Sequence, residues 1–307
     1  MSADALLRLL GALAREGYSF VTTTPLTHER VLARQPRRIA RNLRDVFGWS
    51  LPFEAGILPP DIDELLAEAD ALDDEGGLLR SRVRVSSIGE RLFLHSAFPT
   101  EARDSVFFGP DTYRFVNFLR SELPRLANVR RLVDIGAGSG AGGVMAAPLL
   151  PAARLTLLDI NPSALRLASV NAHHAGVEAE LVEGASLDGV SGLIDLVIAN
   201  PPYIMDEGGR EYRDGGDMLG GRLSLDWTLA AARRLEPGGH MLLYTGSAIA
   251  EGRDALREAL ERELPALGCT LRYREIDPDV FGEELEKPAY AGVERIAAVG
   301  AVVEAAR

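Results

Sequence analysis

The stretch Val133–Gly143, VDIGAGSGAGG, places a glycine-rich turn between an apolar segment (residues 130–136) and an expected helix. Glycine lets the backbone come close to a ligand, and a helix N-terminus offers free N–H groups. The next apolar segment ends in Asp159, whose carboxylate can accept both hydrogen bonds of a ribose diol. Because ligands of open α/β sheets bind at the carboxyl ends of strands, the turn and this acid together predict a nucleotide-type ligand site.

Outward from this turn, apolar strand-like segments alternate with amphipathic helical ones over residues 112–307. This alternation is typical of a parallel sheet covered by helices on both faces. The last two strands are joined by an acidic segment without a helical pattern, which indicates that one of them runs antiparallel. We expect strands at 130–136, 154–160, 179–184, 194–200, 240–246, 270–276 and 294–304, and helices at 112–123, 162–176, 222–235 and 251–264.

The chain before this region divides into two parts. Residues 1–84 have helical patterns, with one helix closing at Gly17, a second starting at Thr27, and a third starting at Pro60 or Asp61 and closing at Gly76-Gly77. Residues 85–111 hold two extended segments around Gly89 and a third short one, which predicts a β-hairpin bridge. The arginines of residues 28–49 form either a solvated helix face or a docking surface for an acidic or RNA-containing partner.

The composition argues against several classes of partner and site. The net charge of −12 disfavours a partner bound mainly through its phosphate backbone. The single cysteine, Cys269, excludes an intramolecular disulfide and a zinc site built on two or more cysteines, and it fits a cytoplasmic protein. The five histidines are scattered, so we expect no metal site. No apolar run approaches ~18 residues without a charge, so we expect no membrane span.

The segment 194–200 ends in the tetrapeptide Asn200-Pro201-Pro202-Tyr203. The Asn200 amide offers an acceptor, and the Pro201 carbonyl adds a second one, fixed by the locked φ angles around it. Two adjacent acceptors can bind both hydrogens of a planar –NH2 group while the Tyr203 ring stacks on its flat face. The nitrogen lone pair then points at a methyl donor, so catalysis needs positioning and electrostatics rather than a strong base.

The glycine turn by itself leaves the cofactor open. The spacing Gly138-x-Gly140-x-x-Gly143 fits a dinucleotide fingerprint, so a nicotinamide-dependent oxidoreductase is a rival interpretation. Gly136-x-Gly138-x-Gly140 after Val133-Asp134-Ile135 instead resembles the motif of class I S-adenosylmethionine (SAM) methyltransferases. The tetrapeptide resembles the N-P-P-Y signature of amino-methyltransferases, for which an oxidoreductase has no use.

This resemblance implies a class I methyltransferase fold, with a Rossmann-like, mostly parallel seven-stranded sheet and an antiparallel last strand. It also implies that SAM is the cofactor, with Asp134 near its amino-acid end and Asp159 on its ribose. The full set of expected cofactor contacts is Asp134, Gly136, Gly138, Gly140, Asp159, Ile160, Ser186 and Asn200. Ser186 is included, with Asp188 as an alternative, because EGASLDG (183–189) lacks the Gly-Asp-aromatic that usually contacts the adenine.

Several features together resemble the HemK-type protein N5-glutamine methyltransferase family. That family has a helical N-terminal domain, a β-hairpin bridge and a SAM domain, which here correspond to residues 1–84, 85–111 and 112–307. Pro110-Asp111-Thr112 matches part of its P-R-P-D-T-E segment, although Phe108-Gly109 and Tyr113 depart from it, and Asn200–Ile204 matches its N-P-P-Y-I. The resemblance implies that residues 1–84 recognise the substrate.

The sequence therefore predicts methyl transfer from SAM to a planar amide or exocyclic amino nitrogen, with Asn200, Pro201 and Tyr203 as catalytic residues. A protein glutamine in a translation-related protein is favoured. An N6-adenine or N2-guanine methyltransferase for RNA or DNA, a small-molecule N-methyltransferase and a SAM-binding module without turnover remain alternatives. Residues 205–222 are expected to form a substrate lid, and the expected substrate contacts are Pro202, Tyr203, Tyr212 and Arg213.

Overall fold

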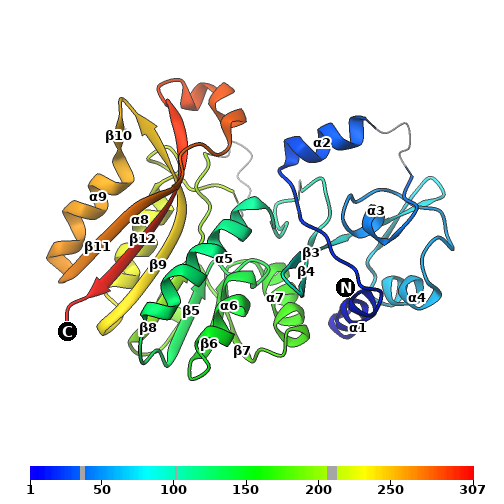
Figure 1. The fold of residues 1–307 in the computed structure, drawn as a ribbon, viewed down its shortest axis with the longest axis horizontal. Helices are drawn as coiled ribbons and strands as arrows, with labels where there is room; N and C mark the ends of the chain where they lie inside the picture. The colour runs from blue at the N-terminus through cyan, green and yellow to red at the C-terminus, as the bar shows by residue number, and fades with distance from the viewer. Residues whose placement is uncertain (35–38, 101, 206–212) are drawn as a thin grey trace.

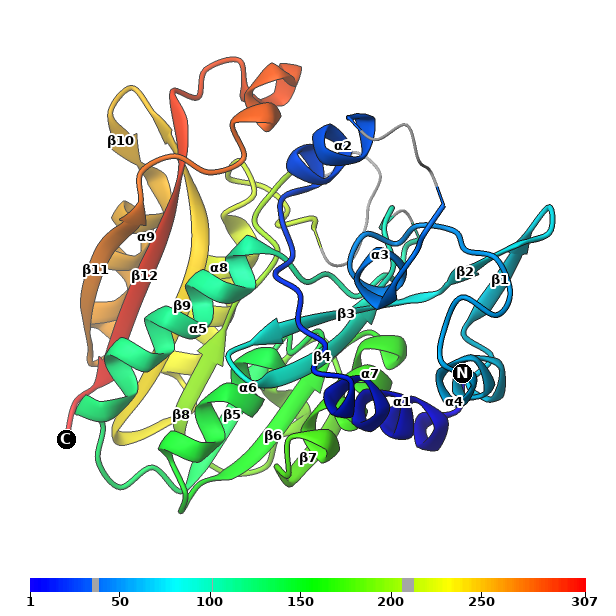
Figure 2. The ribbon, with the colours of Figure 1, turned by 45° about the vertical axis from the view of Figure 1, so that its right-hand side comes forward.

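The computed structural model describes residues 1–34, 39–100, 102–205 and 213–307. The N-terminal third of the chain lies on one side of the molecule, and a large twisted sheet with its helices lies on the other (Figure 1). The hairpin β3–β4 lies between the two parts (Figure 2). The order of N-terminal helices, hairpin and α/β domain is that expected from the sequence.

The N-terminal helices begin at side-chain caps. Helix α1 (Ala3–Arg15) is capped by Ser2, and Gly17 turns the chain away with φ of 66°. Helix α2 (Pro25–Ala33) begins earlier than expected, because the hydroxyl of Thr24 accepts a hydrogen bond from Thr27 N and Pro25 fits the first turn. Helices α3 (Leu43–Phe47) and α4 (Pro60–Glu68) complete the set.

Two short hairpins follow, one of which the sequence analysis missed. Strands β1 (Leu72–Glu75) and β2 (Leu78–Ser81) pair across Gly76-Gly77, so the expectation that residues 1–84 are helical is wrong for this stretch. Both glycines have positive φ and form the turn, rather than ending a helix. Strands β3 (Val83–Ile88) and β4 (Arg91–Ser96) form the expected bridge. The third extended piece, residues 104–112, is not a strand, and its last three residues begin helix α5.

The central sheet confirms the expected architecture. Its main path has the order β11-β12-β9-β8-β5-β6-β7, in which β5 to β9 are parallel and β12 runs antiparallel to β9 and β11. The short β10 pairs with the end of β9. The strand bounds are β5 Arg131–Ile135, β6 Arg154–Asp159, β7 Ala179–Glu183, β8 Ile194–Ala199, β9 Leu235–Ala250, β10 Arg253–Asp254, β11 Cys269–Asp277 and β12 Arg295–Ala305.

Alternate residues of each central strand supply the two hydrophobic layers. Leu132 of β5 joins a cluster with α5 (Pro110–Glu122), α6 (Ala141–Ala146) and α7 (Pro162–His174), whereas Val133 joins a cluster with α8 (Arg222–Ala232) and α9 (Ala255–Glu263). The sheet is therefore covered on both faces, as its apolar strands require. No helix among the described residues is long and apolar enough to cross a membrane.

The N-terminal part is joined to the α/β domain through α7. Ala164, Leu167 and Val170 of α7 belong to the hydrophobic cluster of α1 and α4. On the same helix the fully buried Asn171 accepts a hydrogen bond from Leu94 N and donates to Leu94 O and Ser139 O at 2.8–2.9 Å. This amide connects the bridge hairpin directly to the glycine-rich turn.

Candidate active site

A cavity of about 300 Å³ lies where β5, β6 and β8 end, at the place expected from the glycine turn and Asp159. It is bounded by the glycine turn on one side and by the beginning of the Asn200 tetrapeptide on another. Its lining includes Phe107, Thr112, Phe115, Asp134, Gly136, Gly138, Ser139, Asp159, Ile160, Ala164, Gly184, Ala185, Asn200, Pro202 and Trp227.

The glycine turn presents bare backbone to this cavity. Gly136, Gly138 and Gly140 all have φ between 54° and 76°, a region that residues with a Cβ adopt at a cost. A Cβ on Gly136 would lie 2.6 Å from the ring of Trp227, which lines the same cavity. The turn therefore needs glycine at this position both for its conformation and for space.

Asp134 is the penultimate residue of β5, beneath the turn, where it is almost fully buried. Its Oδ2 accepts a hydrogen bond from Gly143 N at 2.7 Å. Burial raises the pKa of Asp134 to about 7, against the opposing effect of the Gly143 N–H, and the nearby Asp159 charge adds to the rise. This carboxyl is thus poised to lose its proton when a cationic group comes close.

Asp159 also contacts the turn. Its Oδ2 accepts from Gly138 N at 2.8 Å and its Oδ1 from Asn161 N at 2.9 Å, so the carboxylate ends β6 in a fixed orientation at the cavity wall. The neighbouring Ile160 is half-exposed on the same wall. The structure does not bring Ser186 to this wall, because its hydroxyl caps the turn Leu187–Gly189 and donates to Asp188 at 2.7 Å; the backbone of Gly184 and Ala185 lies there instead.

The donor set of the cavity fits SAM. The carboxylate of Asp159 suits a ribose, and the glycine turn, whose space a Cβ would fill, suits an amino-acid tail. The apolar walls formed by Trp227, Phe115 and Ala164 suit a purine. Among the described residues no three His, Cys, Asp or Glu side chains gather as a metal site would require.

A second cavity of about 70 Å³ adjoins the first at the tetrapeptide. Phe107, Asn200 and Pro202 line both cavities, and Pro201, Tyr203, Ile204, Asp111, Arg213 and Phe281 complete the smaller one. Asn200 thus lies at the junction, and its amide makes no hydrogen bond to any residue in the described ranges. Asn200, Pro201, Pro202 and Tyr203 all line this smaller cavity.

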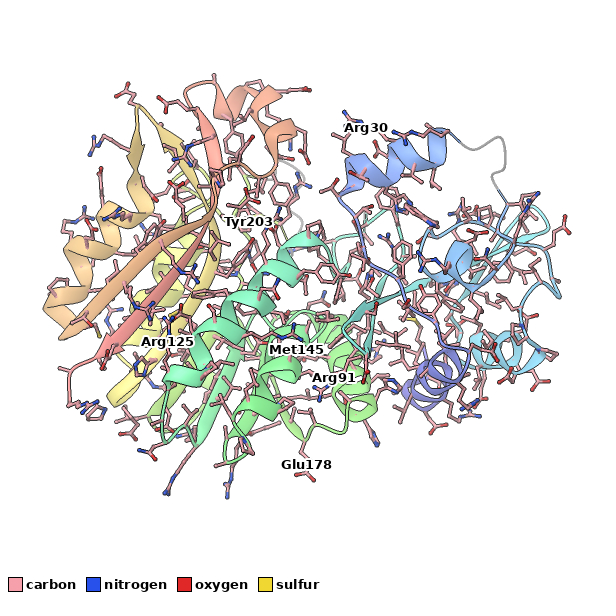
Figure 3. The ribbon with its side chains drawn as sticks, viewed as in Figure 1. Arg30, Arg91, Arg125, Met145, Glu178 and Tyr203 are labelled. Carbon is pink, nitrogen blue, oxygen red and sulfur yellow. The ribbon has the colours of Figure 1, made fainter. Side chains whose placement is uncertain are left out.

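Tyr203 is held by a buried carboxylate that the sequence analysis did not single out. Its hydroxyl donates to Asp111 Oδ2, and the hydroxyl of Tyr244 donates to Asp111 Oδ1 at 2.8 Å. Arg114 contacts the same Oδ1 at 3.3 Å and pairs with Asp277 at 3.0 Å. Tyr203 lies near the upper end of α5, below the orange-red segment between β11 and β12 (Figure 3).

The surroundings of Asp111 and Tyr203 keep the Tyr203 hydroxyl protonated. Burial raises the pKa of Asp111, while the two tyrosine hydroxyls and Arg114 oppose the rise. Burial and the Asp111 charge raise the pKa of Tyr203 well above its usual value. Tyr203 therefore stays a neutral hydrogen-bond donor, and its ring is locked by its own hydroxyl.

The remaining expected substrate contacts divide into two. Arg213 lines the small cavity, where its guanidinium forms an ion pair with the buried Glu284. Tyr212 and the adjacent part of the expected lid, residues 206–212, lie outside the described residues.

Phe107, Phe281 and Trp227 are cavity residues that sequence reasoning missed, since single aromatic residues in loops and helices carry no spacing signal. The sequence analysis noted Asp111 only through its Pro-Asp-Thr context. These residues meet the tetrapeptide through tertiary contacts alone.

Residues 116–263 match the model of the methyltransferase small domain family. The chain is 32% identical over 189 residues to a release factor glutamine methyltransferase of Deinococcus radiodurans, covering 57% of this chain and 63% of that protein. It is 33% identical over 141 residues to a release factor glutamine methyltransferase of Geobacter sulfurreducens, covering 42% and 50%. It is also 34% identical over 103 residues to a ribosomal RNA large subunit methyltransferase G of Vibrio vulnificus, covering 32% and 27%. The matches thus span less than two thirds of the length of these relatives.

Proposed function

We propose that this protein transfers a methyl group from SAM to the side-chain amide nitrogen of a glutamine in a translation-related protein, because residues 116–263 match the methyltransferase small domain model and the chain is similar to two release factor glutamine methyltransferases. The observation that carries the proposal is the position of Asn200 at the junction of the two cavities. A methyl donor in the larger cavity and an amide in the smaller one would meet at this residue.

The larger cavity would hold SAM, which supplies an electrophilic methyl group when bound. Asp159 would accept hydrogen bonds from its ribose, and the backbone of Gly136 and Gly138 would lie against it. Gly140 does not line the cavity, because it faces Ala168 of α7 instead. Asp134 would face the ammonium group of its amino-acid end. These assignments follow the chemistry of the lining residues.

The smaller cavity would bind the acceptor amide. The Asn200 side-chain oxygen and the Pro201 carbonyl would accept its two hydrogens, and the Tyr203 ring would cover its flat face. Hydrogen bonding of this kind keeps the nitrogen lone pair available and aimed across the junction. As the nitrogen takes the methyl group it loses one of the two held protons, which passes to water.

The dimensions of the smaller cavity favour an amide over a nucleobase. A buried water needs roughly 10–15 Å³, so a cavity of about 70 Å³ accommodates only a handful of such small groups. The end of a glutamine side chain suits this space better than a two-ring purine. The acidic net charge of −12 also favours a protein acceptor over an RNA phosphate backbone.

An RNA base is the second candidate acceptor. One argument for it is that a stretch of 103 residues of this chain is similar to a ribosomal RNA large subunit methyltransferase. A second is that the exocyclic amine of a base would present the same planar –NH2 group to Asn200.

The two candidates are tested with methyl-labelled SAM and an extract of cells that lack this protein. We expect label that protease digestion releases and nuclease digestion does not, and we expect Asn200→Ala to abolish it. Label that nuclease releases would identify an RNA or DNA acceptor, and label in small molecules would identify a metabolite. Asn200→Ala with normal labelling would remove the tetrapeptide from the reaction.

A further inference from the structure

The segment between β11 and β12 packs directly against the tetrapeptide and the residues after it. Met205 N donates a hydrogen bond to the hydroxyl of Tyr290 at 2.8 Å, and the guanidinium of Arg213 pairs with the carboxylate of Glu284. Glu284 is only 3% exposed, and Lys287 pairs with its other oxygen. A buried ion pair and a backbone hydrogen bond therefore fix this segment at the mouth of the smaller cavity.

Phe281 is the residue of this segment that enters the cavity wall. Its ring meets the Tyr203 ring edge to face, with centroids 5.7 Å apart and an interplanar angle of 73°. Phe107 lines the same cavity. The acceptor space beside Asn200 is thus bounded by three aromatic side chains, one each from the bridge, the tetrapeptide and the C-terminal segment.

The backbone of Phe281 is in a conformation that a residue with a large side chain adopts only at a cost. Its φ of 55° and ψ of 41° lie in the left-handed region, where glycine is favoured. Strained residues of this kind gather at ligand sites, where the surrounding structure fixes them. Its backbone carbonyl accepts a hydrogen bond from Glu284 N at 2.8 Å, so the anchored segment holds the ring in position.

We propose that Phe281 is a specificity-determining residue of the acceptor cavity, whose flat ring selects a thin planar acceptor group, with Glu284 as the residue that positions it through Arg213. This inference rests on the proposed function, because it takes the cavity beside Asn200 as the acceptor site. The C-terminal segment is then part of the active site, although it lies about 80 residues beyond the tetrapeptide in sequence.

The ring is tested with a pair of variants that separate flatness from apolar bulk. Phe281→Tyr keeps the ring, and Phe281→Leu keeps a large apolar side chain without a flat face. With labelled SAM and increasing amounts of protein extract from cells that lack this protein, we expect Phe281→Tyr to stay near wild type. We expect Phe281→Leu to lose about tenfold in apparent kcat/KM, mainly through KM. The SAM Kd and Tm of both variants should stay near wild type.

Glu251→Gly controls for backbone strain, because Glu251 is an exposed residue with φ of 53° in the turn before β10. It should leave methyl transfer unchanged. Phe281→Leu with wild-type KM would overturn the inference, as would an equal loss in Phe281→Tyr and Phe281→Leu.

Glu284→Gln tests the positioning contact. It should raise the acceptor KM without changing the SAM Kd, and an unchanged acceptor KM would remove Glu284 from the inference. Failure of the proposed function has a different signature, because the wild-type protein would then label no protease-sensitive acceptor, or Asn200→Ala would label it normally.

Discussion

The hydroxyl of Tyr203 donates a hydrogen bond to the carboxylate of Asp111, 92 residues earlier in the chain. Asp111 lies in the first turn of α5, and Tyr203 follows β8. Because Tyr244 of β9 donates to the other oxygen of the same carboxylate, one buried acid holds two rings and joins three elements. The rigidity of the tetrapeptide therefore comes from this carboxylate as well as from its two prolines.

Asp111→Asn should slow methyl transfer while leaving SAM binding nearly unchanged. An amide offers one acceptor oxygen in place of two, so one of the two tyrosines loses its hydrogen bond to a charged group. Such bonds contribute about 1.5–3 kcal/mol, which predicts a loss in kcat of roughly tenfold to a hundredfold. Steady-state kinetics together with calorimetric SAM binding measure both quantities.

The matched control for this variant is Asp277→Asn. Asp277 pairs with Arg114 on the side away from Asp111, and its side chain is 31% exposed. This variant removes a neighbouring charge but leaves both tyrosine contacts in place, so its kcat should stay close to wild type. An equal loss in the two variants would mean that local charge, rather than the Tyr203 contact, governs the rate.

Gly246→Ala should impair methyl transfer by displacing the Tyr203 ring. A Cβ at Gly246 would lie 2.2 Å from the Tyr203 ring, far inside contact distance. Since Gly246 does not line the larger cavity, SAM affinity should change little while kcat falls sharply. Gly292→Ala is the control, because a Cβ there meets nothing within 4 Å and should leave activity intact. Wild-type kinetics for Gly246→Ala would show that the ring position is unimportant.

The affinity for SAM should increase as the pH rises from about 6 to 8. Burial holds the pKa of Asp134 at about 7 in the free protein, so the carboxyl is largely protonated at pH 6 and ionised at pH 8. A cationic ligand group binds better to the ionised form, and each pH unit below the pKa weakens binding by up to about tenfold.

Asp134→Asn should bind SAM more weakly at pH 8 and with a flatter pH profile. Comparing the two proteins in the same buffers cancels the titration of the SAM amino group itself. Parallel profiles for the wild type and the variant would separate Asp134 from the cofactor site.

The fold could be predicted from sequence because each of its signals is local. Strand and helix alternation, the glycines around Gly138, the hairpin at Gly89 and the prolines after Asn200 all act within a few residues. The hairpin at Gly76-Gly77 was missed because LDDE and LLRS show no apolar alternation, and their pairing depends on tertiary contacts. The Thr24 cap was missed for a different reason, since Thr24 and Thr27 are both good capping residues and local preference does not separate them.

The site could be predicted only where its residues act through the backbone or at strand ends. Asp134, Asp159 and Asn200 lie at or just after the ends of three apolar strands, so their meeting at one sheet edge follows from the parallel order. Asp111 reaches the site from the first turn of α5. Phe107 comes from a loop, and Phe281 comes from the segment between β11 and β12. No spacing rule connects such distant positions. Ser186 is the opposite case, because its position in the sequence suggested a cofactor contact, whereas in the structure its hydroxyl caps a short helix.

The central claim is that Asn200 directs methyl transfer to a protein glutamine. Mass spectrometry of cellular protein, searching for methylated glutamine, tests it most directly in three strains that carry the wild-type protein, Asn200→Ala or neither. The account predicts a glutamine that is methylated only in the wild-type strain. Methylglutamine at equal levels in all three strains, or its absence from the wild-type strain, would contradict it.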